Sequence, residues 1–314
     1  MVVLFAADMC CGGADISPSQ VWAALTGGEV SPSTRTIVVQ IRLIKAVVAL
    51  LAGAALAASG LEMQTLFRNP LAGPYVLGIS SGASLGVAIF ILGAPSLGVT
   101  AWVAGLGMAG AAWLGAAAVL ALTAAVAVRV KDIMVLLILG MMFASGVGAI
   151  VQILQYLSDE DSLKAFVIWT MGSLGDVTAA QLAILVPAVA VGLVLALLAS
   201  KPLNLLLFGE DYARTMGLST MRSRTLLFVS TVLLAGSVTA FCGPIGFIGL
   251  AMPHVARMLV SDSDHRVLMP ATMLTGAAVL LGCDIISKFF VVPVNAVTAL
   301  LGIPIVIWIV LKNR

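Results

Sequence analysis

Residue types that carry chemistry are scarce in this chain of 314 residues, which has two histidines and four cysteines. The histidines, His254 and His265, do not have the HExxH spacing of a zinc hydrolase. The cysteines show no CxxC pair typical of a zinc or redox site, and small residues of this kind commonly fill space in a core. We therefore expect no metal bound by this chain.

The residues that precede the lysines exclude a P-loop nucleotide-binding site. A P-loop needs Gly-Lys-Ser/Thr to hold nucleotide phosphates, and no lysine of this sequence follows a glycine. No pairing of a nucleophile with a base falls within a plausible span either, so we expect no catalytic residues and no bound cofactor. If the chain moves a solute at the expense of ATP, a separate ATPase subunit uses the ATP and Mg.

The composition predicts a polytopic membrane protein. Hydrophobic residues make up 61% of the chain and charged residues 10%, whereas soluble domains have about 45–50% and about 25%. These values exclude a soluble globular enzyme, a disordered chain and a nucleic-acid-binding protein. With roughly 20 residues per membrane-spanning helix, the apolar content corresponds to about nine or ten spans. The 31 glycines favour close packing of these helices.

Nine spans can be placed between the charges and turn signals of the sequence. They are 46–66, 75–94, 98–128, 132–157, 179–200, 225–241, 244–260, 268–287 and 294–311. The stretch 165–175 is too short to cross and is expected to lie as a short helix at the outer face. Residues 1–10 are also too short and have no basic segment typical of a signal peptide, so we interpret them as the end of a truncated first helix.

The basic residues predict the orientation. With the loops assigned alternately to two sides, eleven basic residues fall on the first face and five on the second. The first set is Arg68, Arg129, Lys131, Lys201, Arg214, Arg222, Arg224, Arg257, Arg266, Lys312 and Arg314, and the second is Arg35, Arg42, Lys45, Lys164 and Lys288. Because Lys and Arg concentrate in cytoplasmic loops, the first face and the C-terminus are expected to be cytoplasmic.

The longest cytoplasmic segment, within 202–222, is patterned as two short helices. Apolar residues recur there at three- and four-residue spacing, and Gly209 and Gly217 interrupt the pattern. Its partly apolar surface suits a docking element, although an interfacial helix without a partner would have the same composition.

Two further segments are unusual for simple connections between helices. In RNPLAGPYVLGISSGASLG at 68–86, Pro70 and Pro74 prevent a continuous helix, and glycines recur every fourth residue. In GPIGFIGLAMPHVARMLVSDSDHR at 243–266, glycines recur every third residue between two prolines.

Together with LNLLLFGEDYARTMGLS at 203–219, these segments closely resemble the permease subunits of bacterial ABC importers for iron-siderophores, haem and cobalamin. The resemblance extends from about residue 35 to residue 314. It implies an all-α, ten-helix type II importer permease, and one transmembrane domain over 1–314. It also implies a multi-pass protein of the bacterial inner membrane that works as a homodimer. Two ATPase subunits would dock on the cytoplasmic side and a periplasmic or lipoprotein substrate-binding protein outside, with no nucleic acid partner.

The resemblance also implies roles for individual residues. Docking of the binding protein would involve Arg42, Lys45 and Lys288, and the cytoplasmic gate would involve Asn69 and Leu71. Contact with the ATPase would involve Gly209, Glu210, Ala213, Arg214 and Gly217, and the translocation pathway would involve Gln64, Ser80, Ser81 and Gly82. Each role has a structural alternative: the basic residues could anchor helix ends, Asn69 could cap a helix, and the serines could bond to their own helix.

Three polar residues lie within the predicted spans. His254 is expected to be a structural hydrogen-bonding group. Glu62 is expected to reach the cytoplasmic interface or to pair with an arginine, and Asp284 could pair with Lys288 four residues later.

The leading functional hypothesis is an ATP-driven importer that moves an iron chelate from the binding protein into the cytoplasm. A ferric siderophore is the first expectation, followed by haem and cobalamin. The alternative is an ion-coupled secondary transporter of a small solute, but such proteins usually have inverted repeats and intramembrane acids that bind the coupling ion. This sequence shows no convincing repeat, and Glu62 alone makes a poor coupling site.

Overall fold

A computed structural model describes residues 1–93, 100–127 and 133–312, which form helices and turns without a strand. The first half contains α1 (Val2–Cys10), α2 (Pro18–Thr26), α3 (Pro32–Thr36), η1 (Ile37–Arg42), α4 (Leu43–Leu66), η2 (Pro74–Leu77), α5 (Ile79–Ala88), η3 (Ile89–Gly93), α7 (Thr100–Ala127) and α8 (Ile133–Leu157). The second half contains α9 (Glu160–Thr170), α10 (Ala179–Leu198), α11 (Ser200–Leu206), α12 (Glu210–Thr215), α13 (Thr220–Thr231), η4 (Val232–Gly236), α14 (Ser237–Cys242), α15 (Ile248–Val260), α16 (His265–Phe290) and α17 (Val294–Lys312).

Each predicted span coincides with helical structure. Among the described residues, five helical segments are long and apolar enough to cross a membrane, and four apolar helices are shorter. The first span is longer than predicted, because α3, η1 and α4 continue one another over Pro32–Leu66. The prediction for 244–260 was too long, since Gly243 and Phe247 have positive φ and delay the start of α15 to Ile248.

The short outer helix is confirmed as an element, but its predicted position was too late in the chain. It is α9, which begins at Glu160 because the side chain of Asp159 accepts a hydrogen bond from the backbone N–H of Ser162 at 3.0 Å. This N-cap holds the pKa of Asp159 below its usual range.

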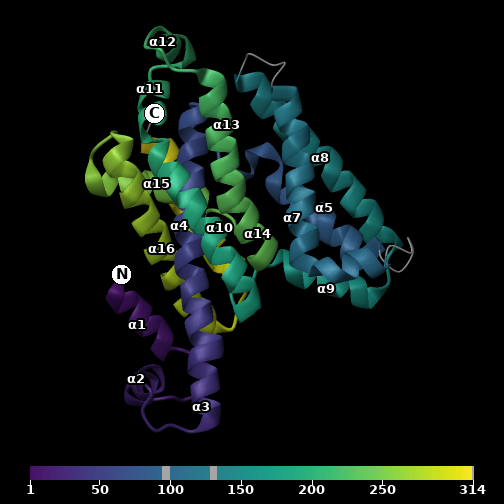
Figure 1. Ribbon diagram of the computed structural model, residues 1–314, viewed down its shortest axis with the longest axis vertical. Coiled ribbons are helices and arrows are strands. Elements are labelled where there is room, and N and C mark those ends of the chain that lie inside the picture. Colours follow the sequence, from purple (N-terminus) through teal and green to yellow (C-terminus); the bar gives the residue numbers. More distant parts are fainter. Residues whose placement is uncertain (94–99, 128–132, 313–314) are drawn as a thin grey trace.

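Helix α4 is the centre of the fold and packs against α16, α15 and α10 (Figure 1). Two glycine pairs permit the closest approaches. Gly53 lies against the backbone of Gly276 on α16, and Gly60 lies against the backbone of Gly249 on α15. A side chain at any of these positions would collide with the facing backbone, so the small residues set the distance between these helices.

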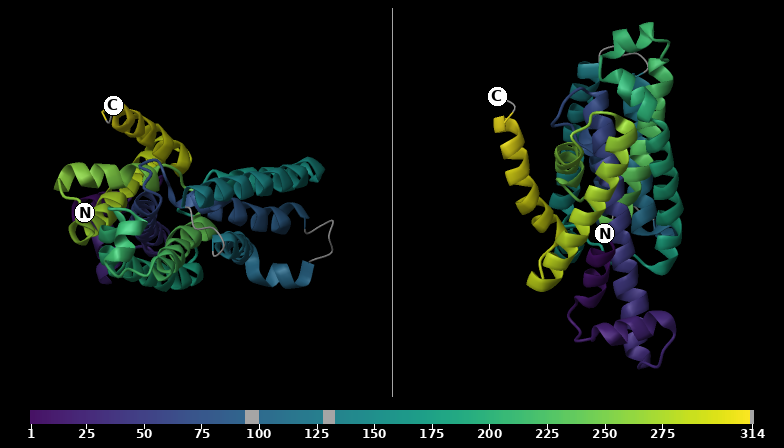
Figure 2. Two further views of the ribbon diagram at one scale, coloured as in Figure 1. Left: turned by 90° about the horizontal axis from the view of Figure 1, so that it is seen from above. Right: turned by 90° about the vertical axis from the view of Figure 1, so that its left-hand side faces the viewer.

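The helices form two groups. α4 lies with α10, α13, α15 and α16, whereas α5, α7, α8 and α9 form a second group beside them (Figures 1 and 2). The long axis has an α12 end, which carries α11 and α12, and an α2 end, which carries α1 to α3.

The two predicted sets of basic residues lie toward opposite ends of the molecule. Arg68, Lys201, Arg214, Arg222, Arg224, Arg257 and Arg266 belong to elements or helix termini at the α12 end, and Arg35, Arg42, Lys45, Lys164 and Lys288 belong to those toward the α2 end. Lys312, also of the first set, ends α17 at the C-terminus, and Arg129, Lys131 and Arg314 lie outside the described residues. Within the described part, the charge segregation agrees with the alternating topology derived from the loops.

Candidate coupling, gate and docking sites

The segment at the α12 end has the two-helix structure predicted for it. Helices α11 and α12 are separated by Gly209, which has φ +99°, and α12 is followed by Gly217, which has φ +84°. Other residues rarely adopt these backbone angles, so the two glycines permit the sharp turns that expose α12.

Glu210 is oriented differently from the prediction, which had its charge facing an ATPase. Its carboxylate accepts two hydrogen bonds of 2.8 Å from the guanidinium of Arg224 on α13, and Arg214 lies 3.7 Å away. This bidentate pair fixes α12 onto α13. Arg214 is half exposed and donates to the hydroxyl of Thr220 at 3.3 Å. Of the two predicted charges, Glu210 and Arg214, it is therefore Arg214 that remains accessible.

The segment also exposes a group of apolar side chains. Ala213 is fully buried, whereas Phe208 and Tyr212 are 69% and 51% exposed, with ring centroids 5.5 Å apart, and Met216 follows at the same spacing, 59% exposed. We call Phe208, Tyr212 and Met216 the apolar tip. Sequence reasoning placed Tyr212 and Met216 in the pattern but missed Phe208, because Phe208 precedes the break at Gly209 and the turn brings its ring beside Tyr212.

A buried hydrogen-bond network connects α11 to α16 and α4. The side-chain oxygen of Asn204 accepts bonds from the backbone N–H and from Nδ1–H of His265, at 2.9 and 2.8 Å. Because an amide oxygen only accepts, the ring proton lies on Nδ1, and Nε2 accepts from the hydroxyl of Thr65 at 2.9 Å. We call Asn204, His265 and Thr65 the α11–α4 relay.

Asp264 completes this network at the start of α16. Its carboxylate accepts from the Asn204 amide at 2.6 Å and from the backbone N–H of Arg266 at 2.9 Å. These donors hold the pKa of Asp264 below its usual range, the backbone bond being the larger cause. Sequence analysis included Asp264 and His265 in the segment 243–266 but gave them no role, because their partner Asn204 is about 60 residues away in the sequence.

The predicted gate residues lie in the turn after α4. The side chain of Asn69 accepts the backbone N–H of Leu71 at 2.9 Å within this turn and caps neither α4 nor η2, and Leu71 is exposed. His254 on α15 donates from Nε2 to the carbonyl of Pro70 at 2.8 Å, so its structural role is confirmed. The gate role of Asn69 and Leu71 stays a prediction, and His254 fixes the turn that presents them.

Two of the predicted pathway positions lie inside the protein. Gln64 is buried, donates to the carbonyl of Leu250 at 2.9 Å and accepts from Arg257 at 3.3 Å. Gly82 lies against the backbone of Gly115, where the close packing of α5 on α7 leaves no room for a side chain. Gln64 borders a small cavity of about 200 Å³ beside Asn69, whereas Ser80 and Ser81 on α5 are partly exposed. Within this single chain, the two serines are therefore the more accessible pathway candidates.

The predicted docking residues Lys45 and Lys288 meet a pair of buried acids. Lys288 lies 2.7 Å from Asp8 and 2.8 Å from Asp284, and Lys45 lies 3.0 Å from the other oxygen of Asp284. The pair expected between Asp284 and Lys288 is thus confirmed. The charges of the four side chains sum to zero, and the cluster connects α1, α4 and α16.

Arg42 is also used inside the protein. Its guanidinium donates to the carbonyls of Met9, Cys10 and Ala14 at the end of α1 and just beyond it. Arg42 and Lys288 are therefore nearly buried and bound to groups of the same chain, and their part in docking stays a prediction. Lys45 is 21% exposed and is the most accessible of the three.

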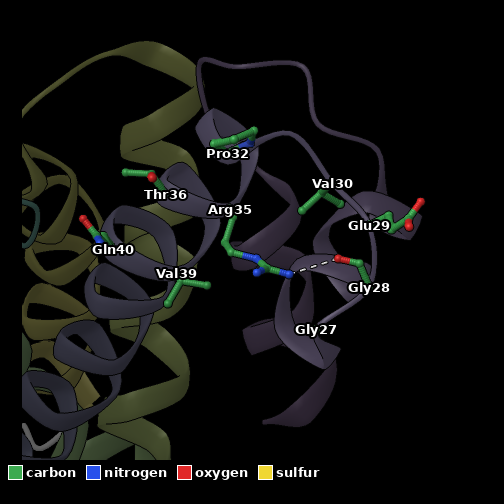
Figure 3. A pocket seen from close by; sticks show the side chains of 9 residues that line it. All are labelled: Gly27, Gly28, Glu29, Val30, Pro32, Arg35, Thr36, Val39 and Gln40. Atoms are coloured by element: carbon green, nitrogen blue, oxygen red, sulfur yellow. Dashed lines mark hydrogen bonds between the residues drawn. The ribbon is translucent and has the colours of Figure 1, made fainter.

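A pocket of about 660 Å³ lies beside the α2–α3 connection (Figure 3). Arg35 on α3 lines it and donates to the carbonyl of Gly28 at 3.0 Å, which attaches the connection to α3. Arg35 therefore stabilises the α2 end from its exposed surface, whereas Arg42 is buried beside α1.

The bundle of apolar helices, with its polar networks at both ends, defines a polytopic membrane protein. Residues 1–312 match the FecCD transport family. The chain is 39% identical to the vitamin B12 import system permease protein BtuC of Klebsiella pneumoniae subsp. pneumoniae, covering 100% of this chain and 92% of the relative. It is 34% identical to the hemin transport system permease protein HmuU of Yersinia pestis, covering 100% and 93%.

A solved structure gives the same result. The fold matches a metal-chelate type ABC transporter in an inward-facing conformation with a TM-score of 0.84 and 30% identity, covering 99% of this chain and 97% of the other. The chain belongs to the FecCD transport family and is a permease subunit of an ABC importer rather than an enzyme.

Proposed function

We propose that the chain forms the membrane pathway of an ATP-driven importer for a bulky metal chelate of the cobalamin, haem or ferric-siderophore class. The full-length similarity to a vitamin B12 permease and a hemin permease carries this proposal. It favours cobalamin and haem over the ferric siderophore expected from the sequence. A separate ATPase would dock at the α12 end. We infer that this end and the C-terminus lie on the cytoplasmic side of the membrane.

We further propose that two copies of the chain flank the pathway. Helix α8 supports this, because most of its surface is exposed. Gln152 on that surface is exposed and has no hydrogen bond within the described part of the chain. A side-chain amide is unfavourable against lipid, so this face suits an aqueous pathway or a second copy.

Uptake into proteoliposomes tests the transport proposal. Vesicles containing this chain with its ATPase and its binding protein should accumulate labelled cobalamin, haem or ferric siderophore only when ATP is enclosed. Competition among the three ligands would identify the substrate. Uptake driven by an ion gradient without ATP would contradict the proposal and favour the secondary-transporter alternative.

The apolar tip is the proposed contact with the ATPase. Replacing Phe208 and Tyr212 together by alanine should lower ATP-dependent uptake about 10-fold or more, since large aromatic residues dominate the binding energy of interfaces. The Phe290→Ala variant is a matched control, because Phe290 is 73% exposed at the opposite end. Normal uptake by the double variant in correctly inserted protein would contradict this assignment.

Docking of the binding protein is proposed at the α2 end, with Lys45 as the contact and Arg42 and Lys288 as supports. The Lys45→Gln variant leaves Asp284 paired with Lys288 and removes the accessible charge. It should raise severalfold the concentration of binding protein needed to stimulate ATP hydrolysis, most strongly at low salt. Lys164→Gln, at an exposed lysine of α9, is the control. An unchanged concentration dependence for Lys45→Gln would rule out this contact.

A further inference from the structure

Glu62 is an acidic residue in the interior of the bundle that neither coupling nor docking uses. It lies on α4, and its side chain is 0% exposed. The sequence predicted a carboxylate that reaches the interface or pairs with an arginine, and this expectation was wrong. One oxygen, Oε2, accepts a hydrogen bond of 3.1 Å from the hydroxyl of Thr231 on α13, and Oε1 has no partner.

No charged group on the packed elements compensates this carboxyl within the described residues. Helix α10 and η4 carry no charged residue. On α15, Arg257 donates to Gln64. On α13, the guanidinium of Arg224 is bound to Glu210, and Arg224 lies about 10 Å along the helix from Thr231. Arg222 lies further along α13 and is exposed.

The remaining charges belong to the ends of the bundle. Arg68, which follows α4, is exposed and its guanidinium lies beside Gly209. Lys45, Asp8, Asp284 and Lys288 form their own cluster at the α2 end of α4. Lys201 and Arg266 are on α11 and at the start of α16, and both line a separate cavity at the α12 end.

An ionised carboxylate in this position would be very unfavourable, because an apolar interior does not replace the hydration that an unpaired charge has in water. A buried group in such surroundings takes up a proton instead. The neutral acid fits the contacts, since Oε2 accepts from Thr231 and Oε1, which has no hydrogen-bond partner, can carry the proton.

The structure therefore assigns Glu62 as an intramembrane proton-binding site at the contact between α4 and α13. Thr231 ends α13, and the chain continues directly into the π-helical turn η4, while the neighbouring Ser230 donates to the carbonyl of Gly192 on α10 at 3.2 Å. The site thus lies where α13, which leads from the apolar tip, meets the central helix. Separation of α13 from α4 would admit water and allow the proton to leave.

Infrared spectroscopy of the full chain in liposomes at neutral pH tests this assignment without requiring transport. Glu62→Gln keeps the shape and neutrality of the side chain. The spectrum of the unmodified protein minus that of this variant should contain the carbonyl band of one protonated carboxylic acid. Glu160→Gln, at an exposed glutamate of α9, is the matched control and should remove only ionised-carboxylate bands.

A second variant tests the contact with α13. Thr231→Val keeps the size of the side chain and removes its hydroxyl, so the acid band should remain and shift to higher frequency as the hydrogen bond is lost. Carboxylate bands in place of the acid band in the Glu62→Gln difference spectrum would overturn the proton site. An unshifted acid band in Thr231→Val would overturn its location at the α4–α13 contact.

Discussion

The fold depends on one constraint, which is that polar groups among apolar helices must find partners inside the protein. The central helix α4 meets this constraint at both ends. Lys45 joins the buried acids at the α2 end, and Thr65 binds His265 at the α12 end. Close packing at Gly53 and Gly60 brings α16 and α15 near enough for these polar contacts to form. Because few polar groups are available, each one fixes the position of a whole helix.

The same contacts give a physical route between the proposed ATPase surface and the proposed gate. The apolar tip is attached to α13 through Glu210 and Arg224, and α11 is attached to α4 through the α11–α4 relay. The turn that follows α4 carries Asn69 and Leu71 and is fixed to α15 by His254. A displacement of α11 and α12 would therefore act on α4 directly and on the gate turn through α4, without requiring the intervening apolar helices to deform.

The sequence predicted the features that depend on local pattern. The spans followed from apolar runs, the coupling turns from Gly209 and Gly217, and the Asp284–Lys288 pair from a four-residue spacing. It did not predict contacts between distant residues, since Thr65 and His265 are 200 residues apart and Arg42 reaches back 28 residues to Ala14. Glu62, Arg42 and Lys288 were interpreted as interfacial or accessible for this reason, because a charge in the sequence does not reveal whether a partner lies beside it.

The most direct test of this account is a double-mutant cycle on the α11–α4 relay, measured as the free energy of unfolding in detergent. The single variants are Asn204→Ala and His265→Phe. The account predicts that their combined effect is smaller than the sum by at least about 1 kcal/mol, because either change alone breaks the same bond and leaves a buried partner unpaired. Asn204→Ala combined with Asn295→Ala, whose side chain binds Gly246 instead, should be additive. Additive effects for Asn204 and His265 would contradict the claim that paired polar groups hold α11, α16 and α4 together.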